Sequence, residues 1–209
     1  MKTLRIILGD QLTHTISSLE GIDREKDEIL MMEFDQEMTN VPHHPKKIAF
    51  LLSARRHFRD ELIEKKLKVH YIRIDSKESR GIFAETLEFF LKSRSFDRII
   101  MTEPSEWYLS EQVEQFEQKS AVKIELLLDN RFFCSINDFR NWAKGKKSLL
   151  MENFYRMQRR EHHILLDSEG QPKGGLWNYD KENRKPLKVI SKFPCPMQFE
   201  PDSITEEAM

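Results

Sequence analysis

Five short runs of apolar residues, separated by gaps long enough for a helix, constrain the fold of this chain more than any other feature. The runs cover residues 4–8, 29–34, 69–74, 98–101 and 124–128. Most are nearly continuous Ile, Leu, Met and Val, whereas a sheet with one face in water would alternate apolar and polar residues. The pattern therefore predicts a parallel sheet that is covered on both faces.

The gaps between these runs have the periodicity of amphipathic helices. Residues 45–66 carry apolar side chains at helical spacing with charged residues between them, and residues 82–91 and 106–118 repeat the pattern. Strands and helices thus alternate through residue 129. The sequence predicts an α/β fold, a Rossmann-like doubly wound sheet of five parallel strands with helices on both faces.

The chain of 209 residues is long enough for one large domain, or for one domain with a tail. Residues 1–130 are expected to form the Rossmann-like domain. Residues 131–209 are expected to form a helical and irregular appendage, with helices at residues 137–143 and 149–166. The segment after these helices is rich in Gly, Pro and polar residues, which is typical of a chain that wraps a surface or links domains.

Composition and charge exclude several classes of protein. A formal net charge of -1, from 34 Lys and Arg against 35 Asp and Glu, argues against a chain that binds nucleic acid through its overall charge. Cys134 and Cys195 lie far apart without a CxxC pair, so no zinc or iron–sulfur site is predicted and a reducing compartment is favoured. No apolar run approaches the roughly 20 residues of a membrane span, and the N-terminus leads directly into a strand. These features predict a cytoplasmic protein without a signal peptide or membrane contact.

Acidic residues recur at the ends of the predicted strands, at Asp10, Glu33, Asp75, Glu103 and Asp129. The carboxyl ends of parallel strands share one edge, where open α/β sheets bind ligands at the point of strand-order reversal. The alternative is that these acids only cap the helices or turns that follow. Gly9 directly follows the first run, so the backbone there can approach a ligand closely, and the neighbouring Asp and Gln can contact a heterocycle.

Motifs for phosphate and metal binding are absent from the sequence. There is no GxGxxG, and the Lys-rich residues 144–148 lack the upstream glycine of a Walker A loop. The adjacent pairs His43–His44 and His162–His163 would point about 100° apart on a helix, and no HExxH accompanies them. No metal or phosphate site is therefore predicted, and His43 and His44 are expected to hydrogen-bond a ligand or a turn carbonyl before the long helix.

A basic segment follows the predicted sheet. Between residues 144 and 160, one acid, Glu152, accompanies six basic side chains: Lys144, Lys146, Lys147, Arg156, Arg159 and Arg160. Aromatic residues lie among them, and this combination can follow a phosphate backbone or stack on bases. The alternative is a solvated helix face whose aromatic side chains pack into the core. Further along, Gly174 and Gly175 precede Trp177, which predicts a tight turn anchored by the indole.

Several local motifs together give the chain a resemblance to a known family. They are LGDQL at residues 8–12, His43–His44 with Lys47 and Ile48, SARRHF at 53–58, TEPSEW at 102–107, MENFYR at 151–156, and GGLWNYD at 174–180 extending to Pro186. On these motifs the chain resembles, essentially end to end, the deoxyribodipyrimidine photolyase-related proteins. This is the bacterial iron–sulfur cryptochrome and photolyase branch that includes the prokaryotic (6-4) photolyases. The resemblance implies the N-terminal α/β antenna domain of such a protein.

The family is implied to repair ultraviolet lesions in DNA, or to sense blue light, by electron transfer from a reduced flavin. The resemblance also implies that a lumazine antenna and a four-cysteine iron–sulfur cluster assist this electron transfer. The resemblance places FAD and the cluster in a helical C-terminal flavin domain outside these residues, since two cysteines cannot supply the cluster. The chain is then expected to lack photolyase activity alone and to contact DNA only in the full-length protein. Apolar segments that the flavin domain would cover, at residues 151–166 and 193–209, are expected to be exposed and to favour self-association.

The resemblance also implies which residues hold the antenna chromophore, dimethyl-ribityllumazine. They are Gly9, Asp10, Gln11 and Leu12 after the first strand, Glu33, Phe34, Glu37 and Met38 after the second, and His43, Ile48 and Leu51 at the long helix. The acids and the amide can hydrogen-bond the ring edge or the ribityl hydroxyls, while the apolar side chains can pack against the ring.

Two other functions stay open on the sequence alone. A nucleotide-binding α/β enzyme of the wider superfamily could use the same sheet edge for adenylyl transfer or hydrolysis, but it needs a phosphate site for which no Gly-rich loop is present. A free-standing DNA-associated module could use residues 144–160, with weak and salt-sensitive binding. A near-ultraviolet or violet absorption band in the purified protein would favour the antenna.

Overall fold

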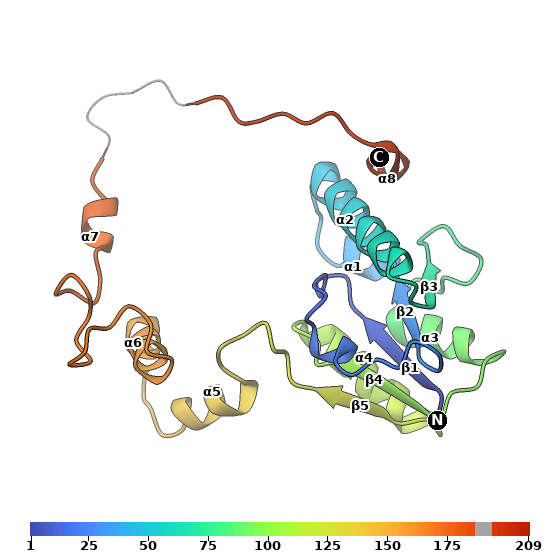
Figure 1. Ribbon diagram of the computed structural model, residues 1–209, viewed down its shortest axis with the longest axis horizontal. Helices are drawn as coiled ribbons and strands as arrows, with labels where there is room; N and C mark the ends of the chain where they lie inside the picture. The colour runs from blue at the N-terminus through green and yellow to red at the C-terminus, as the bar shows by residue number, and fades with distance from the viewer. Residues whose placement is uncertain (187–193) are drawn as a thin grey trace. The chain divides into compact units, whose positions relative to one another are not determined.

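The computed structural model describes residues 1–186 and 194–209 and contains a parallel five-stranded sheet (Figure 1). The strands are β1 (Thr3–Ile7), β2 (Glu28–Met32), β3 (Val69–Ile72), β4 (Arg98–Thr102) and β5 (Ile124–Leu127). They are hydrogen-bonded in the order β3-β2-β1-β4-β5, and every neighbouring pair is parallel. The Rossmann-like α/β fold is confirmed, because all five predicted strands form within two residues of their expected bounds.

Helices lie between the strands, as predicted, and further helices follow β5. They are the 3₁₀ turn η1 (Ser17–Leu19) and helices α1 (Asp35–Thr39), α2 (Pro45–Glu64), α3 (Phe83–Leu91), α4 (Trp107–Lys119), α5 (Ile136–Ala143), α6 (Met151–Glu161), α7 (Asp180–Asn183) and α8 (Ser203–Ala208). Helix α2 starts where Pro45 occupies the first turn and the His44 ring accepts a hydrogen bond from the Lys46 N–H at 3.1 Å. Within residues 1–186 and 194–209, none of these helices is long and apolar enough to cross a membrane.

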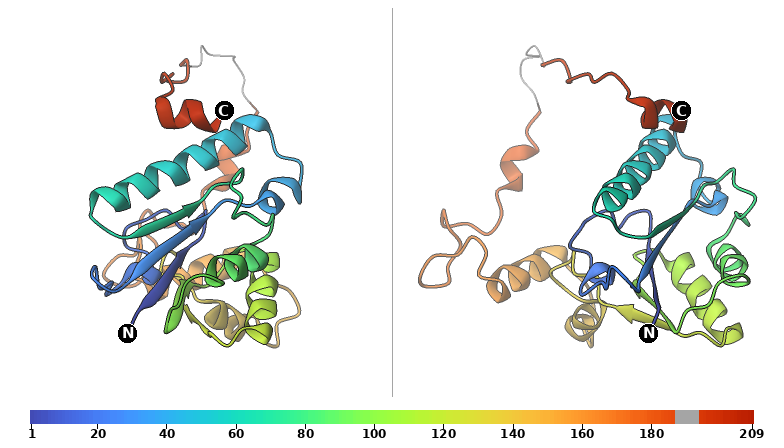
Figure 2. Two further views of the ribbon diagram at one scale, coloured as in Figure 1. Left: turned by 90° about the vertical axis from the view of Figure 1, so that its right-hand side faces the viewer. Right: turned by 45° about the vertical axis from the view of Figure 1, so that its right-hand side comes forward.

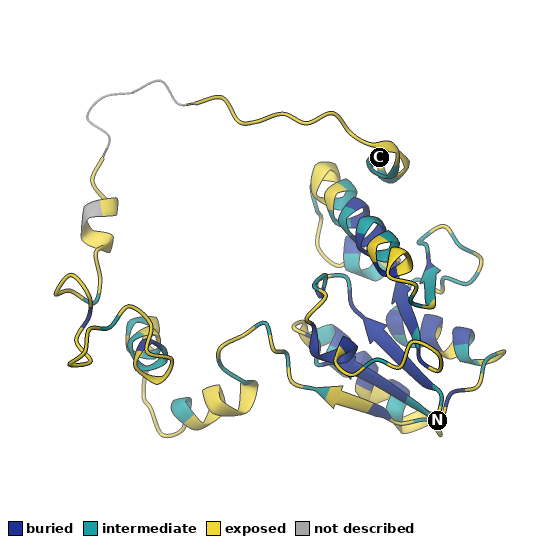
Figure 3. Cartoon of the chain, viewed as in Figure 1, coloured by how far each residue is buried: buried dark blue, intermediate teal, exposed yellow. Residues whose placement is uncertain are grey.

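Alternate residues of the strands fill two apolar clusters, one on each face of the sheet. On one face, Leu4 and Ile6 lie in a cluster with Phe83 of α3. On the other face, Ile7 lies in a cluster with Phe58 of α2. Figure 2 shows α2 on one side of the sheet and α3 and α4 on the other, and Figure 3 shows the inner strands buried. The sheet is therefore covered on both faces, as the continuous apolar runs predict.

The chain divides into two compact units. The first comprises Met1–Arg131 together with Glu200–Met209, and the second comprises Phe132–Phe199. The division after Arg131 lies one residue from the expected boundary. The final segment differs from the expected appendage, because it returns to the first unit and places α8 against α2 (Figure 1).

Polar contacts hold α8 against α2. Ser53 Oγ lies 2.8 Å from Thr205 Oγ1, and His57 Nε2 lies 2.6 Å from Asp202 Oδ2. Asp202 also caps α8, because its Oδ1 accepts a hydrogen bond from the Thr205 N–H at 2.9 Å. The sequence gives no apolar period for α8, so its position depends on these polar contacts.

We expect the docking of α8 to depend on pH. The hydrogen bond to Asp202, followed by that to the Ser53 carbonyl, raises the pKa of His57. The Thr205 N–H and then His57 lower the pKa of Asp202 to about 2. The contribution of His57 to the stability of the docked α8 is complete below the ordinary histidine pKa of about 6.5. It is lost as the pH rises through the raised pKa of His57. The contribution of Asp202 is complete above about pH 3.9 and is lost as the pH falls through its lowered pKa, so α8 is held best between these limits.

Amide hydrogen exchange at Thr205, expressed as a protection factor, measures this effect. Protection is expected to fall from about pH 6 to about pH 9 in the wild type, and to be low at both values in His57→Gln. His14→Gln is the matched control, since His14 pairs at 2.8 Å with Glu61 of α2 rather than with α8. A wild-type profile without pH dependence, or an equal loss in both variants, would contradict a role for the His57–Asp202 pair.

The second unit contains the predicted tight turn. Gly174 and Gly175 have φ angles of 82° and 81°, which confirms the turn, and the Tyr179 hydroxyl donates to the Gly174 carbonyl at 2.7 Å. Helix α6 ends at Glu161 rather than at the expected residue 166. The reason is that His163 and Leu165 have φ angles of 52° and 53°, which an α-helix does not allow.

Several predicted basic residues of this unit have partners inside it. The Arg156 Nε donates to Glu152 at 2.9 Å, and the Arg159 Nε donates to the Ile164 carbonyl at 3.1 Å. The guanidinium of Arg160 lies 4.7 Å from the centre of the Trp177 ring. The indole therefore anchors the turn through cation–π contact with α6.

Apolar side chains are exposed in the two segments where exposure was expected. Met151 and Leu165 are exposed in the second unit, and Met197 and Phe199 are exposed before α8. Residue 193 of the expected range lies outside the described residues. The expectation is confirmed for these four side chains.

Candidate functional site

The strand order reverses at β1. From β1 the chain passes to β2 and β3 on one side of the sheet, and it then returns to β4 on the other side. The loops that follow β1 and β4 therefore run in opposite directions from the carboxyl ends of these two strands. Open α/β sheets bind ligands in the crevice between such loops. We call this place, together with α1 and the adjacent part of α2, the β1/β4 edge.

A buried arginine lies against Gly9 at the β1/β4 edge. Arg55 of α2 is 2% exposed, and a Cβ atom added at Gly9 would overlap its guanidinium group, so only glycine leaves the required space. The Arg55 Nη2 pairs with Oε1 of Glu37 on α1, but Nε and Nη1 have no hydrogen-bond partner among the described residues. The structure thus brings together Gly9 and Glu37, two residues predicted for the site, around a cation with two unused donors.

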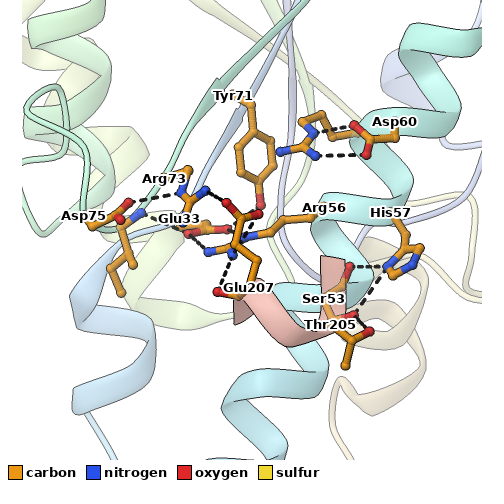
Figure 4. A network of polar contacts seen from close by, with 12 residues as sticks. Glu33, Ser53, Arg56, His57, Asp60, Tyr71, Arg73, Asp75, Thr205 and Glu207 are labelled. Carbon is orange, nitrogen blue, oxygen red and sulfur yellow. Dashed lines mark hydrogen bonds and ion pairs between the residues drawn. The ribbon is translucent and has the colours of Figure 1, made fainter. Parts of the chain in front are cut away.

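The neighbouring Arg56, in contrast to Arg55, has its guanidinium hydrogen-bonded within the protein. Arg56 is also 2% exposed, but it donates to both carboxylate oxygens of Glu33, at 2.9 and 3.2 Å (Figure 4). Glu33 also accepts hydrogen bonds from the Tyr71 hydroxyl at 2.6 Å and from the Ile74 N–H at 2.9 Å. Burial would raise the pKa of Glu33, but the hydrogen bonds from Arg56, Tyr71 and Ile74 outweigh it and lower the pKa. Glu33 is therefore ionised and bonded to the protein.

Gln11 is also bonded within the protein. Its buried side chain accepts from the Leu8 N–H at 3.2 Å and donates to the carbonyls of Thr102 and Glu103 at 3.4 and 3.3 Å. It therefore joins the carboxyl end of β1 to that of β4. Gln11 and Glu33 shape the β1/β4 edge, and their direct contacts with a ligand stay predictions.

Arg131 connects three loops at the β1/β4 edge. It donates to Asp10 Oδ2 at 3.0 Å, to Asp129 Oδ2 at 2.6 Å and to Ser105 Oγ at 3.3 Å. The hydrogen bond to Asp129, and to a smaller degree that to Asp10, raises the pKa of Arg131. Arg131 thus fixes the Asp10 carboxylate, which is still partly exposed, after the end of β1.

The remaining predicted site residues lie at different depths. Phe34 and Met38 are buried, and Phe34 belongs to the core cluster on the α3 and α4 face. The half-buried ones are Leu12, His43, Ile48 and Leu51. These four side chains retain exposed surface with which they could contact a ligand.

Three residues of the β1/β4 edge were missed by the sequence analysis: Arg55, Tyr108 and Arg131. A signal existed for Arg55, because it follows Leu51 by one helical turn and so shares its face of α2. No local signal existed for the contacts of Arg131 with Asp10 and Ser105, since these two partners lie far from it in the sequence.

Tyr108 of α4 adds a third unused donor. Its hydroxyl is buried and makes no hydrogen bond of good geometry in the described part of the chain, although the Glu106 carboxylate lies near enough to attract its proton. Burial, followed by the carboxylates of Glu106 and Glu37, raises the pKa of Tyr108. The hydroxyl therefore keeps its proton and is able to donate it to a ligand acceptor.

Ser53 and His57, which Figure 4 shows, lie with Asp202 in the order of a catalytic triad, but the three residues are bonded differently. His57 Nδ1 is 2.8 Å from the Ser53 carbonyl and 3.3 Å from the Ser53 hydroxyl. A carbonyl oxygen only accepts, so Nδ1 carries a proton and is unable to take one from the serine. These residues fasten α8. Among residues 1–186 and 194–209, no group of three or more His, Cys, Asp or Glu is placed to hold a metal ion.

Comparison with known proteins gives three findings. Residues 5–209 match the family described as deoxyribodipyrimidine photo-lyase-related protein. The chain is 41% identical over 209 residues to a (6-4) photolyase of Agrobacterium fabrum, which covers 100% of the chain and 41% of that protein. It is 24% identical over 153 residues to an uncharacterized protein of Acanthamoeba polyphaga mimivirus, covering 70% of the chain and 75% of that protein. The chain thus spans 41% of the length of the photolyase that it matches.

Proposed function

The chain belongs to the family of deoxyribodipyrimidine photo-lyase-related proteins, and on this premise we propose that its first unit binds dimethyl-ribityllumazine as a light-absorbing antenna. The observation that carries the proposal is the guanidinium of Arg55, which is 2% exposed, lies against Gly9 and has two donors without partners in the described chain. Buried donors are normally satisfied, so an unsatisfied pair at a ligand-binding edge favours a missing acceptor.

The residues of the β1/β4 edge suit this ligand. Arg55 and Tyr108 would donate to ring carbonyl or ring nitrogen acceptors, and Asp10 and Glu37 would accept hydrogen bonds from ribityl hydroxyls. Leu12, Phe34, Met38, Ile48 and Leu51 would offer apolar contact to the ring, with His43 at the start of α2. The bound ring would supply absorption in the near-ultraviolet and violet.

Within a longer protein, the antenna would serve light-driven DNA repair or blue-light sensing. The relative from Agrobacterium is named a (6-4) photolyase, and the chain spans 41% of it. We assign no catalytic role to residues of this chain, and we place FAD and the iron–sulfur cluster in a separate helical domain. The exposed apolar residues Met151, Leu165, Met197 and Phe199 would be covered by that domain or by self-association.

DNA contact is proposed only for such a longer protein. Lys144, Lys147 and Arg160 are exposed in the second unit, whereas Arg156 and Arg159 are engaged with Glu152 and the Ile164 carbonyl. Few exposed cations give weak, salt-sensitive binding. This supports DNA contact as an addition to other contacts rather than as the main function of the chain.

Titration of the purified protein with dimethyl-ribityllumazine, followed by absorption and fluorescence, tests the proposal. Saturable binding with a shifted violet band is the expected result. Asp10→Ala should weaken binding by roughly 1–3 kcal/mol, or about fivefold to 150-fold, because a hydrogen-bond acceptor is lost. Unchanged spectra at saturating pigment in the folded wild type would contradict the antenna function.

A further inference from the structure

We propose that the β1/β4 edge selects an uncharged ligand over a phosphorylated one, and that the Arg55–Glu37 pair sets this selectivity. The inference rests on the proposed function, because it concerns the ligand of the same edge. It goes beyond that function by assigning a discriminating role to two residues and by naming the ligand class that they reject.

The first reason is that the positive charge of Arg55 is already balanced. Its Nη2 pairs with Glu37, whose side chain is only 16% exposed, so the pair as a whole is neutral. The unused Nε and Nη1 still offer N–H groups to a ligand. A neutral carbonyl or hydroxyl oxygen satisfies these donors, whereas a phosphate would bring a charge that the neutral Arg55–Glu37 pair does not balance.

The second reason is the excess of acids around the edge. Arg131 is the cation that binds both Asp10 and Asp129, so two carboxylates share one guanidinium. The N-terminus of α4 would favour an anion through its dipole, but its N-cap residue is Glu106. A bound phosphate would therefore meet like charges on several sides of the edge, and each costs free energy in a partly buried site.

The third reason is the contrast between adjacent arginines. Arg56 is as buried as Arg55, but its Nε and Nη2 are both bonded to Glu33. Unsatisfied donors in the interior of a protein lower its free energy of unfolding. Arg55 therefore contributes little to the stability of the fold without a ligand. Its place beside Gly9 is explained if a ligand completes its hydrogen bonds.

Two ligands that differ by one phosphoryl group test the proposal: dimethyl-ribityllumazine and its phosphate ester at the end of the ribityl chain. The wild type is expected to bind the uncharged compound at least about tenfold more tightly. Glu37→Gln leaves Arg55 with a net positive charge, so this ratio should fall to about one or reverse. Glu64→Gln removes an exposed acid at the end of α2 and is the matched control, in which the wild-type ratio should persist.

The outcomes separate this inference from the proposed function. Tighter or equal binding of the phosphate ester by the wild type, or an unchanged ratio in Glu37→Gln, overturns the inference while the antenna function stands. Binding of neither compound counts against the antenna function.

A measurement without ligand then decides the role of Arg55. In the Glu37→Gln background, Arg55→Met is expected to leave the denaturation midpoint unchanged or to raise it. The substitution removes a buried charge and two unsatisfied donors, and it loses at most the one hydrogen bond to residue 37. A fall as large as that caused by Arg56→Met would show that Arg55 is structural, and the inference would then be wrong.

Discussion

Replacing Arg56 by Met is expected to lower the free energy of unfolding by about 3–5 kcal/mol, the usual cost of removing one partner from a buried ion pair. Glu33 has no exposed surface, and it would lose hydrogen bonds at 2.9 and 3.2 Å. Its pKa is lowered in the native protein, so its contribution is present above the ordinary glutamate pKa of about 4.3 and is lost at lower pH. The difference between variant and wild type should therefore shrink as the solution is acidified below that value.

Urea denaturation of the full chain measures this prediction. Arg59→Met is the control, because Arg59 lies on the same helix and pairs with Asp60, with side chains 20% and 39% exposed. Its guanidinium lies 5.0 Å from the centre of the Tyr71 ring but makes no hydrogen bond to Glu33 in the described part of the chain. Arg59→Met is expected to lower the free energy of unfolding by less than about 1 kcal/mol. Arg56→Met with Glu33→Leu should recover part of the stability, since the uncompensated carboxylate is gone. Equal losses in Arg56→Met and Arg59→Met would mean that the Glu33 network contributes no more than a surface pair.

The sheet could be predicted from the sequence because a strand that is buried on both faces needs an apolar residue at nearly every position. In β4, Ile99, Ile100 and Met101 are all buried, although they alternate between faces, so the run is apolar without interruption. Helix α8 has no comparable apolar pattern in its sequence. It has no buried residue, and polar contacts with Ser53 and His57, far away in the sequence, decide its position.

The candidate site could be predicted only in part. The acids predicted at strand ends do lie at the carboxyl ends of the strands, and their contact with a ligand stays a prediction. Both Glu33 and Glu37 follow β2, and nothing in their local sequence separates their roles. Arg55 and Arg56 are adjacent on α2 and so point about 100° apart, one toward Glu37 and one toward Glu33. The packing of α2 on the sheet decides that Glu33 is fully bonded, whereas the partner of Glu37, Arg55, keeps two donors without a partner in the described chain.

Leu51→Trp is expected to abolish binding of dimethyl-ribityllumazine, with a loss of at least about a hundredfold. Leu51 is half-buried and precedes Arg55 by one turn of α2, so a larger side chain at this position would fill the space beside the guanidinium. Overpacking of this kind costs about 1–3 kcal/mol of stability, which a sheet covered on both faces should tolerate. Titration by absorption gives the affinity, and circular dichroism with urea denaturation shows that the variant is folded.

Phe50→Trp provides the control for this last prediction. Phe50 is the neighbouring residue of α2 and is 70% exposed, so the same indole is introduced on the solvent side of the helix. Pigment affinity should stay near the wild-type value, because the indole does not enter the β1/β4 edge. If Leu51→Trp is folded and binds the pigment as tightly as Phe50→Trp does, the ligand does not lie beside Arg55. The two unused donors of Arg55 would then need another acceptor, and the antenna would have to be sought at a different part of the first unit.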